Sequence, residues 1–319
     1  MKMNKMILLI SVIVVSLLIL HSHPLNADTE RDPDIDIRMR FAIVEGDAES
    51  VKKFLEQGAN ANITYSDGVT PIADAINRSR APIDVVKVLI EHGADPKLKS
   101  NGSSPLALAQ IMNNEELIRI LHDYAGSDAE LYDVALFFFN KEKEISALEY
   151  ADKALKMNPN NVEAWALKGS IFSAQNYYNI KYAEMAYQKA FEASSISLKA
   201  NKSADNYKSA VWYALLSSNF NEALKVANEG LSLYPEDGNL ELNCAHAMLL
   251  LGRKKEAIDF YKKAYADLQR SGRYADRAAQ IMTDNFANLM RRYADRASEL
   301  KWAEEKIKCD FSRAFTHLK

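Results

Sequence analysis

Cys244 and His246 are the closest approach in this sequence to a pair of metal-ligating side chains. They stand two residues apart in an apolar stretch, and residues at that spacing point to different faces of a helix. The sequence contains no Gly-Lys-Ser/Thr phosphate loop, no Gly-x-Ser-x-Gly elbow, no His-Glu-x-x-His motif and no Cys-x-x-Cys pair. We therefore predict no catalytic residue, no metal site and no cofactor.

The cysteine count also limits the class of protein. Two cysteines exclude a disulfide-dense scaffold and a four-cysteine zinc site. Cys244 occupies a position that favours a small buried apolar side chain, which predicts a core thiol. A disulfide between Cys244 and Cys309 stays open, because it requires close Cα atoms that a sequence does not reveal.

Composition and length predict a folded helical protein of about two domains. The 319 residues are 48% hydrophobic and 26% charged, which excludes wholesale disorder. Only 11 glycines and 8 prolines occur, which favours long helices over a many-turned all-β fold. The net charge of -3 lacks the basic excess of a general nucleic-acid binder, so we expect no nucleic-acid partner.

The N-terminal segment has the pattern of an export signal. Lys2 and Lys5 precede a mostly apolar run over residues 6–20, and a short polar stretch follows. The run is shorter than the roughly 20 apolar residues that a membrane-spanning helix needs. We expect residues 1–27 to be a cleaved signal peptide and the protein to be periplasmic or secreted. The alternative is an uncleaved inner-membrane anchor with the folded part outside the cytoplasm.

Residues 34–126 contain a motif series that recurs every 34 or 35 residues. The complete series is a tight-turn dipeptide with a glycine at positive φ, then a hydroxyl residue and a proline that predict a capped helix start, and then a helix-ending glycine, and the second unit contains all of it. The motifs are Gly58 in the first unit, Asp67-Gly68, Thr70-Pro71 and Gly93 in the second, and Asn101-Gly102 and Ser104-Pro105 in the third.

This series resembles the ankyrin repeat, whose signature is Thr-Pro-Leu-His-x-Ala. The signature histidine is replaced by Ala73 and Ala107, and Tyr124 stands where the last helix-ending glycine would fall. The resemblance implies three helix pairs with a concave protein-binding surface.

A second pattern covers residues 128–265 and resembles the tetratricopeptide repeat. Small residues recur on the second helix of each predicted pair, and a proline ends two of these helices. The four sets are Ala147, Ala151, Ala154 and Pro159; Ala183, Tyr187 and Ala190; Ala223, Ala227, Gly230 and Pro235; and Ala257, Tyr261 and Ala264. Two extra residues near Tyr177-Tyr178 and the stretch 194–203 depart from the pattern. The latter is either a loose connection or an extended helix.

The tail over residues 266–319 predicts a long amphipathic helix. Its apolar stripe contains Met282, Phe286, Leu289, Tyr293, Ala297, Leu300 and Ile307. Such a helix either caps the solenoid or binds a partner. It can also cover the groove of the second array, over residues 282–300.

We expect an all-α, two-array solenoid that acts as a non-catalytic scaffold or adaptor for another protein or an apolar peptide segment. The alternatives are an inhibitor or immunity-type protein that blocks a partner and, less favoured, a hydrolase with an unrecognised site. In tetratricopeptide proteins the first helix of each pair lines the groove, and the resemblance places seven residues there: Tyr132, Phe139, Lys208, Trp212, Leu215, Leu242 and His246. Some members grip a C-terminal carboxylate with Lys, Asn and Arg. Only Lys208 matches that clamp, so we expect an apolar partner segment instead.

Overall fold

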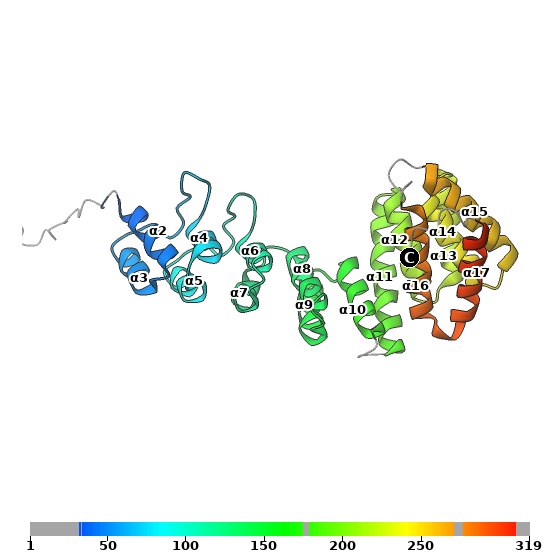
Figure 1. Ribbon diagram of the computed structural model, residues 1–319, viewed down its shortest axis with the longest axis horizontal. Helices are drawn as coiled ribbons and strands as arrows, with labels where there is room; N and C mark the ends of the chain where they lie inside the picture. The colour runs from blue at the N-terminus through cyan, green and yellow to red at the C-terminus, as the bar shows by residue number, and fades with distance from the viewer. Residues whose placement is uncertain (1–31, 33, 175–178, 271–276, 311–319) are drawn as a thin grey trace, which may run out of the picture. The chain divides into compact units, whose positions relative to one another are not determined.

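The protein is a chain of α-helices joined by short loops (Figure 1). The computed structural model describes residue 32 and residues 34–174, 179–270 and 277–310. Within these ranges the only β pairing is a single bridge between Ser100 and Ser103, so the predicted all-α fold is confirmed. The predicted leader over residues 1–27 lies outside the described residues.

None of the described helices is long and apolar enough to cross a membrane. The chain divides into two compact units between Tyr124 and Ala125.

The N-terminal unit consists of three helix pairs. In each pair a first helix packs on the second, and a longer loop leads to the next pair. The pairs are α2 (Ile35–Glu45) with α3 (Ala48–Glu56), α4 (Pro71–Arg78) with α5 (Pro82–Glu91), and α6 (Pro105–Ile111) with α7 (Glu115–Leu121), which continues into the 3-10 turn η1 (His122–Tyr124).

The turn and helix-start signals hold, with one exception. Gly68 has a φ angle of 77° and Gly102 one of 85°, as the tight turns require. Ser104 accepts a capping hydrogen bond from the amide of Ala107 at 3.2 Å. The predicted cap at Thr70 is wrong, because its buried hydroxyl makes no hydrogen bond. Pro71 alone fixes the start of that helix.

The C-terminal unit continues as helix pairs and ends in two further helices. The first four helices are α8 (Asp128–Phe139), α9 (Glu144–Met157), α10 (Val162–Ser173) and α11 (Ile180–Ala200). They are followed by α12 (Ala204–Leu216), α13 (Phe220–Leu233), α14 (Gly238–Leu250) and α15 (Lys254–Arg270). The last elements are α16 (Ala278–Arg292), the 3-10 turn η2 (Ala294–Arg296) and α17 (Ala297–Asp310).

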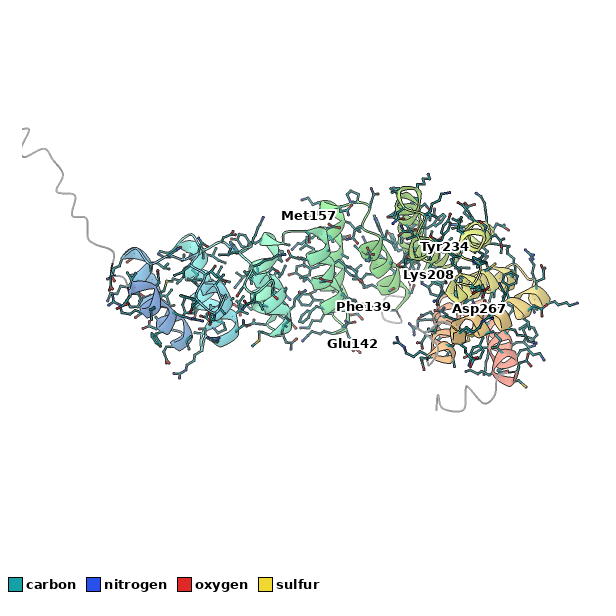
Figure 2. The ribbon with its side chains drawn as sticks, turned by 90° about the horizontal axis from the view of Figure 1, so that it is seen from above. Phe139, Glu142, Met157, Lys208, Tyr234 and Asp267 are labelled. Carbon is teal, nitrogen blue, oxygen red and sulfur yellow. The ribbon has the colours of Figure 1, made fainter. Side chains whose placement is uncertain are left out.

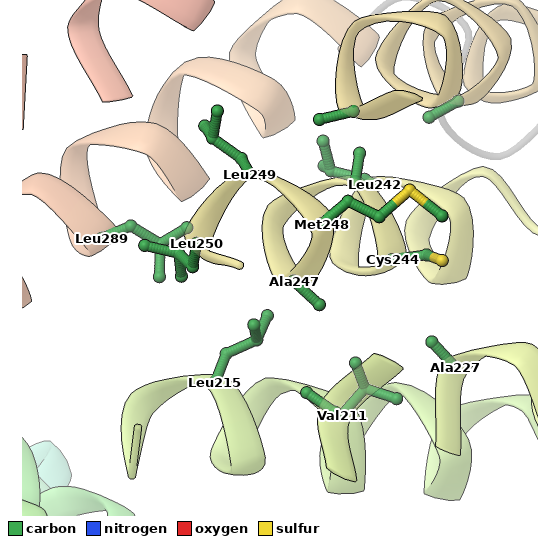
Figure 3. Close-up of a cluster of buried hydrophobic side chains, with 14 of the residues drawn as sticks. Val211, Leu215, Ala227, Leu242, Cys244, Ala247, Met248, Leu249, Leu250 and Leu289 are labelled. Carbon is green, nitrogen blue, oxygen red and sulfur yellow. The ribbon is translucent and has the colours of Figure 1, made fainter. Parts of the chain in front are cut away.

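Helix α14 forms the centre of this unit. All but one of its thirteen residues are buried. Val211 and Leu215 of α12 point toward Ala247 of α14, and Leu289 of α16 belongs to the same apolar cluster (Figure 3). A solenoid that continued regularly would leave one face of its last pairs open, whereas here the tail helices cover that face.

Small residues set the spacing between helices in this unit. A Cβ atom added to Gly169 on α10 would lie 2.5 Å from the ring of Tyr187 on α11. Helix α11 extends to Ala200, so the stretch 194–203 is mainly an extended helix. The two extra residues near Tyr177-Tyr178 lie outside the described residues. Cys244 and Cys309 are not joined in a disulfide.

The tail is two helices rather than the single long helix predicted over residues 282–300. The apolar stripe is buried as expected, with Met282, Phe286 and Leu289 almost fully covered. Helix α16 ends at Arg292, and Tyr293 leaves the helical conformation with ψ at 64°. This break lets Tyr293 and Arg296 reach carbonyl oxygens at the C-terminal ends of α12 and α14. Those carbonyls have no partner within their own helices.

Candidate functional site

Three of the seven predicted binding residues do not lie on an open surface. Leu215, Leu242 and His246 are completely buried. The ring of His246 packs edge-to-face on Phe286 of α16, with 5.1 Å between centroids. The tail helix therefore covers this part of the predicted groove, which corrects the placement of these three residues.

His246 is part of the core and is uncharged. Its Nδ1 atom lies 2.7 Å from the hydroxyl oxygen of Tyr261, and complete burial lowers the pKa of the imidazole to about 3. Cys244 is also buried, and burial raises the pKa of its thiol to about 12, which suppresses the nucleophilic thiolate. The part of the chain that the structure describes holds no group of three His, Cys, Asp or Glu placed to bind a metal.

Trp212 remains half-buried and lines two hollows, which together we call the Trp212 cleft. The amide hollow has a volume of about 450 Å³ and the arginine hollow one of about 270 Å³. The amide hollow is lined by Asp205, Lys208, Ser209, Trp212, Tyr213, Asn239, Asn243, Ile281 and Asn285. The arginine hollow is lined by Phe139, Ser170, Ser173, Ala174, Tyr187, Trp212, Leu216, Asn288, Arg291 and Arg292.

The other predicted residues divide between these hollows. Lys208 of α12 lines the amide hollow, and Phe139 of α8 lines the arginine hollow. Figure 2 labels both residues on these separate helices. Tyr132, on α8, lines neither. The ammonium group of Lys208 is held by the carboxylates of Asp205 at 2.7 Å and Asp237 at 3.4 Å. These two carboxylates hold the pKa of Lys208 above its usual value against the opposing effect of burial.

The amide hollow is built for hydrogen bonding rather than for proton transfer. Asn239 and Asn243 stand one turn apart on α14, and Asn285 of α16 lines the same hollow. Asn243 is 5% exposed, and its side-chain oxygen has no hydrogen-bond partner. A buried carboxamide oxygen without a partner favours a ligand that brings a donor.

The sequence interpretation missed the contribution of α16 to the cleft. Ile281, Asn285, Asn288 and Arg292 follow one another at spacings of four, three and four, directly beside the apolar stripe. This spacing places them on one face of the helix. The signal was present in the sequence, but only the fold shows that this face borders Trp212.

A second candidate lies on the N-terminal unit, for which the sequence predicted a protein-binding surface without specifying its residues. Ile37 is 53% exposed and Phe41 is 70% exposed on α2. A hollow of about 570 Å³ adjoins them, and we call this surface the α2 face. Its lining residues are Ile37, Arg40, Phe41, Val44, Ile63, Thr64, Tyr65, Ser66 and Arg78.

Arg40 is fixed at the centre of the α2 face. Its guanidinium donates hydrogen bonds to the carboxylates of Asp74 and Asp67, each at 2.6 Å. It also lies over the ring of Tyr65, 4.2 Å from the centroid. The carboxylates raise the pKa of Arg40 despite the opposing effect of burial. The result is a rigid polar centre beside exposed apolar side chains, a combination suited to contact with another protein.

Comparison with known proteins identifies the repeats of the N-terminal unit. Residues 39–133 match the family described as Ankyrin repeats (3 copies). The first repeat array is therefore a set of three ankyrin repeats, as the motif series predicted. Ankyrin repeats generally mediate binding between proteins.

Individual relatives are similar to this chain over about 80 to 100 residues. The chain is 41% identical to the 2-5A-dependent ribonuclease of Homo sapiens over 78 residues, which are 24% of this chain and 10% of that protein. It is 35% identical to the putative ankyrin repeat protein FPV031 of Fowlpox virus over 88 residues, or 26% of each chain. It is 30% identical to the potassium channel GORK of Arabidopsis thaliana over 102 residues, 32% of this chain and 12% of that one. The chain thus spans between a tenth and about a quarter of the length of these relatives.

Proposed function

We propose that the protein is a non-catalytic adaptor that binds a partner protein on the α2 face. The observation that carries this proposal is the exposure of Phe41 and Ile37 beside the fixed guanidinium of Arg40. Large apolar side chains exposed together, next to an arginine, favour a protein interface. Three ankyrin repeats around this surface support the same function.

The chemistry of the buried groups favours binding over catalysis. His246, Tyr261 and Cys244 have strongly shifted pKa values, but burial in the core causes each shift. A catalytic group needs access to substrate as well as a shifted pKa. The similarity to a ribonuclease covers the repeat region alone and so gives no support to an activity.

We propose further that residues 128–265 form a tetratricopeptide-like array and that residues 266–319 close it. The alanines of the pattern, such as Ala147, Ala151 and Ala154, are fully buried between paired helices. Helices α9 and α13 end just before Pro159 and Pro235. The ankyrin array over residues 34–126, this array and the closing helices make up the proposed organisation.

Export is proposed from the composition of residues 1–27. A cleaved leader predicts a mature N-terminus near Asp28 and soluble periplasmic or secreted material. N-terminal sequencing of the fractionated protein tests this. Recovery of the full-length chain in salt-resistant membranes would favour the anchored alternative.

Photo-cross-linking tests the α2 face directly. A photoreactive amino acid at position 41 is expected to capture a partner protein in cells, whereas the same group at Ile111, which is 73% exposed on α6, is not. With the captured protein purified, Phe41→Ser is expected to weaken binding by about 2 kcal/mol. Equal capture from both positions, or an unchanged affinity, would remove this face from the proposal. Loss of the partner's own activity on binding would identify the protein as an inhibitor.

A further inference from the structure

Arg292 is a buried cation with no ion-pair partner among the residues that the structure describes. The residue is only 9% exposed to solvent. The Nε atom donates a hydrogen bond to the carbonyl oxygen of Leu216 at 2.8 Å, whereas the buried Nη2 atom has no hydrogen-bond partner. Among the described residues, no carboxylate forms an ion pair with it. A charged group in such a position is costly unless an anion accompanies it.

Arg292 lines the arginine hollow. Arg291 and Asn288, from the same helix, line it too, and no acidic side chain does. The hydroxyls of Ser170 and Ser173 already donate hydrogen bonds to the carbonyls of Ala166 and Gly169. The cationic donors available to a ligand therefore come from α16 alone, and two of its three lining side chains are cationic.

The rest of the hollow is apolar and small. Phe139, Tyr187, Trp212 and Leu216 form its wall, and its volume is about 270 Å³. Guanidinium groups and aromatic side chains that line one small hollow suit a planar anion attached directly to an apolar body. A carboxylate matches the planar donor geometry of a guanidinium.

We propose that the arginine hollow binds an apolar carboxylate, with the carboxylate on Arg292 and Arg291 and the apolar body against Trp212. Two sources share this chemistry: a small free carboxylic acid and the C-terminal residue of a polypeptide. The adjoining amide hollow favours the polypeptide, because Asn239, Asn243 and Asn285 offer partners for the backbone that leads away from a terminal residue. The site lies on the C-terminal unit and does not depend on the α2 face.

The geometry differs from the carboxylate clamp considered in the sequence analysis. In that clamp the cations belong to the first helix of each pair, and here only Lys208 is cationic at such a position. Lys208 is already paired with Asp205 and Asp237. The arginines of the proposed site come instead from the tail helix, so the proposal adds a carboxylate to the apolar partner segment expected from the sequence.

Calorimetric titration of the full-length protein tests the proposal with three probes. They are N-acetyl-leucine, an acetylated pentapeptide of glycine and serine ending in leucine as the free acid, and the same pentapeptide as the C-terminal amide. We expect the free-acid peptide to bind at least about tenfold more tightly than the amide, since a hydrogen bond to a charged group is lost in the amide.

Tighter binding of the free-acid peptide than of N-acetyl-leucine assigns the polypeptide as the source. Equal binding of those two acids keeps the site but assigns a small acid. Equal binding of acid and amide, or no binding of either acid, would overturn the proposal.

Variants locate the binding on the protein. Arg292→Gln is expected to abolish the preference for acid over amide, but it also removes the contact with Leu216. Arg291→Gln is therefore the second test, because Arg291 is exposed and its loss should leave the fold intact. It is expected to weaken the acid about threefold and leave the amide unchanged. Lys301→Gln on α17 removes the same charge away from the hollow and should change neither. An equal effect of Arg291→Gln and Lys301→Gln would assign the preference to net charge and overturn the site.

Discussion

The hydroxyl of Tyr293 donates a hydrogen bond to the carbonyl oxygen of Leu215, 78 residues earlier in the chain. The same hydroxyl oxygen accepts a hydrogen bond from the amide of Ser218 at 3.2 Å. Tyr293 is the first residue after α16, and Leu215 lies in the last turn of α12. This contact adds hydrogen bonds to backbone groups at the end of α12 and fixes the tail on the array.

Tyr293→Phe is expected to lower the free energy of unfolding by about 1 kcal/mol, because it removes the hydrogen bond that the hydroxyl donates to the carbonyl oxygen of Leu215. Urea denaturation of the full chain measures the change. Tyr182→Phe is the control, since Tyr182 is 54% exposed on α11. Equal stability of the two variants would show that the contact contributes nothing measurable.

Gly68 tests the turn between the first and second ankyrin repeats. Its φ angle is 77°, and an added Cβ atom would lie 2.3 Å from Oδ1 of Asn101. Gly68→Val is therefore expected to cost about 2–3 kcal/mol of stability. Gly58→Val is the matched control: the φ angle there is 98°, but an added Cβ meets no atom within 4 Å. Gly68→Val should be the more destabilising in a denaturant titration, and the reverse order would contradict this reading of the turn.

The sequence predicts the helices well because their signals are local. A glycine needed at positive φ, a proline at a helix start and an apolar stripe at helical spacing each depend on a few neighbouring residues. Gly68, Pro71 and the stripe through Met282 and Phe286 lie where these signals place them. Thr70 shows the limit, because tertiary packing and not its own type decides whether its hydroxyl caps the helix.

The site is less predictable because a stripe does not specify which helix will cover it. Leu242 and His246 have the spacing of groove residues, yet the tail helix buries them. Phe41 stands in an apolar run with Ala42 and Ile43, which are buried, yet it is 70% exposed. Arg292 gains its significance only from the break at Tyr293 and the position of Leu216, both of which are tertiary features.

His246 predicts a dependence of stability on pH. Burial holds the pKa of its imidazole at about 3 in the folded protein, whereas an unfolded histidine has a pKa of about 6.5. Below pH 6.5 the unfolded state therefore binds a proton that the folded state does not, and stability falls by about 1.4 kcal/mol per pH unit until pH 3.

When the pH is lowered from 7 to 5, the free energy of unfolding of His246→Phe is expected to fall by about 2 kcal/mol less than that of the native protein. Phenylalanine keeps an aromatic ring beside Tyr261 and Phe286 but has no titrating group. His92→Phe, outside the core at the end of α5, serves as the control. Parallel pH profiles for the native protein and His246→Phe would show that another group titrates in this range.

Trp212 lines both the amide hollow and the arginine hollow, so its side chain contributes to every part of the Trp212 cleft. Its indole is half-buried, so it belongs neither to the sealed core around α14 nor to the free surface. Truncation of a tryptophan at the centre of a binding site commonly costs about 2 kcal/mol or more of binding free energy.

Trp212→Ala is therefore expected to weaken binding of the free-acid peptide by at least that amount. Trp302→Ala, on α17 and 44% exposed, should leave the affinity unchanged. Calorimetry on both variants, with circular dichroism to verify their folding, makes the comparison. A folded Trp212→Ala protein with native affinity would make Trp212 a spacer between helices and move the peptide elsewhere.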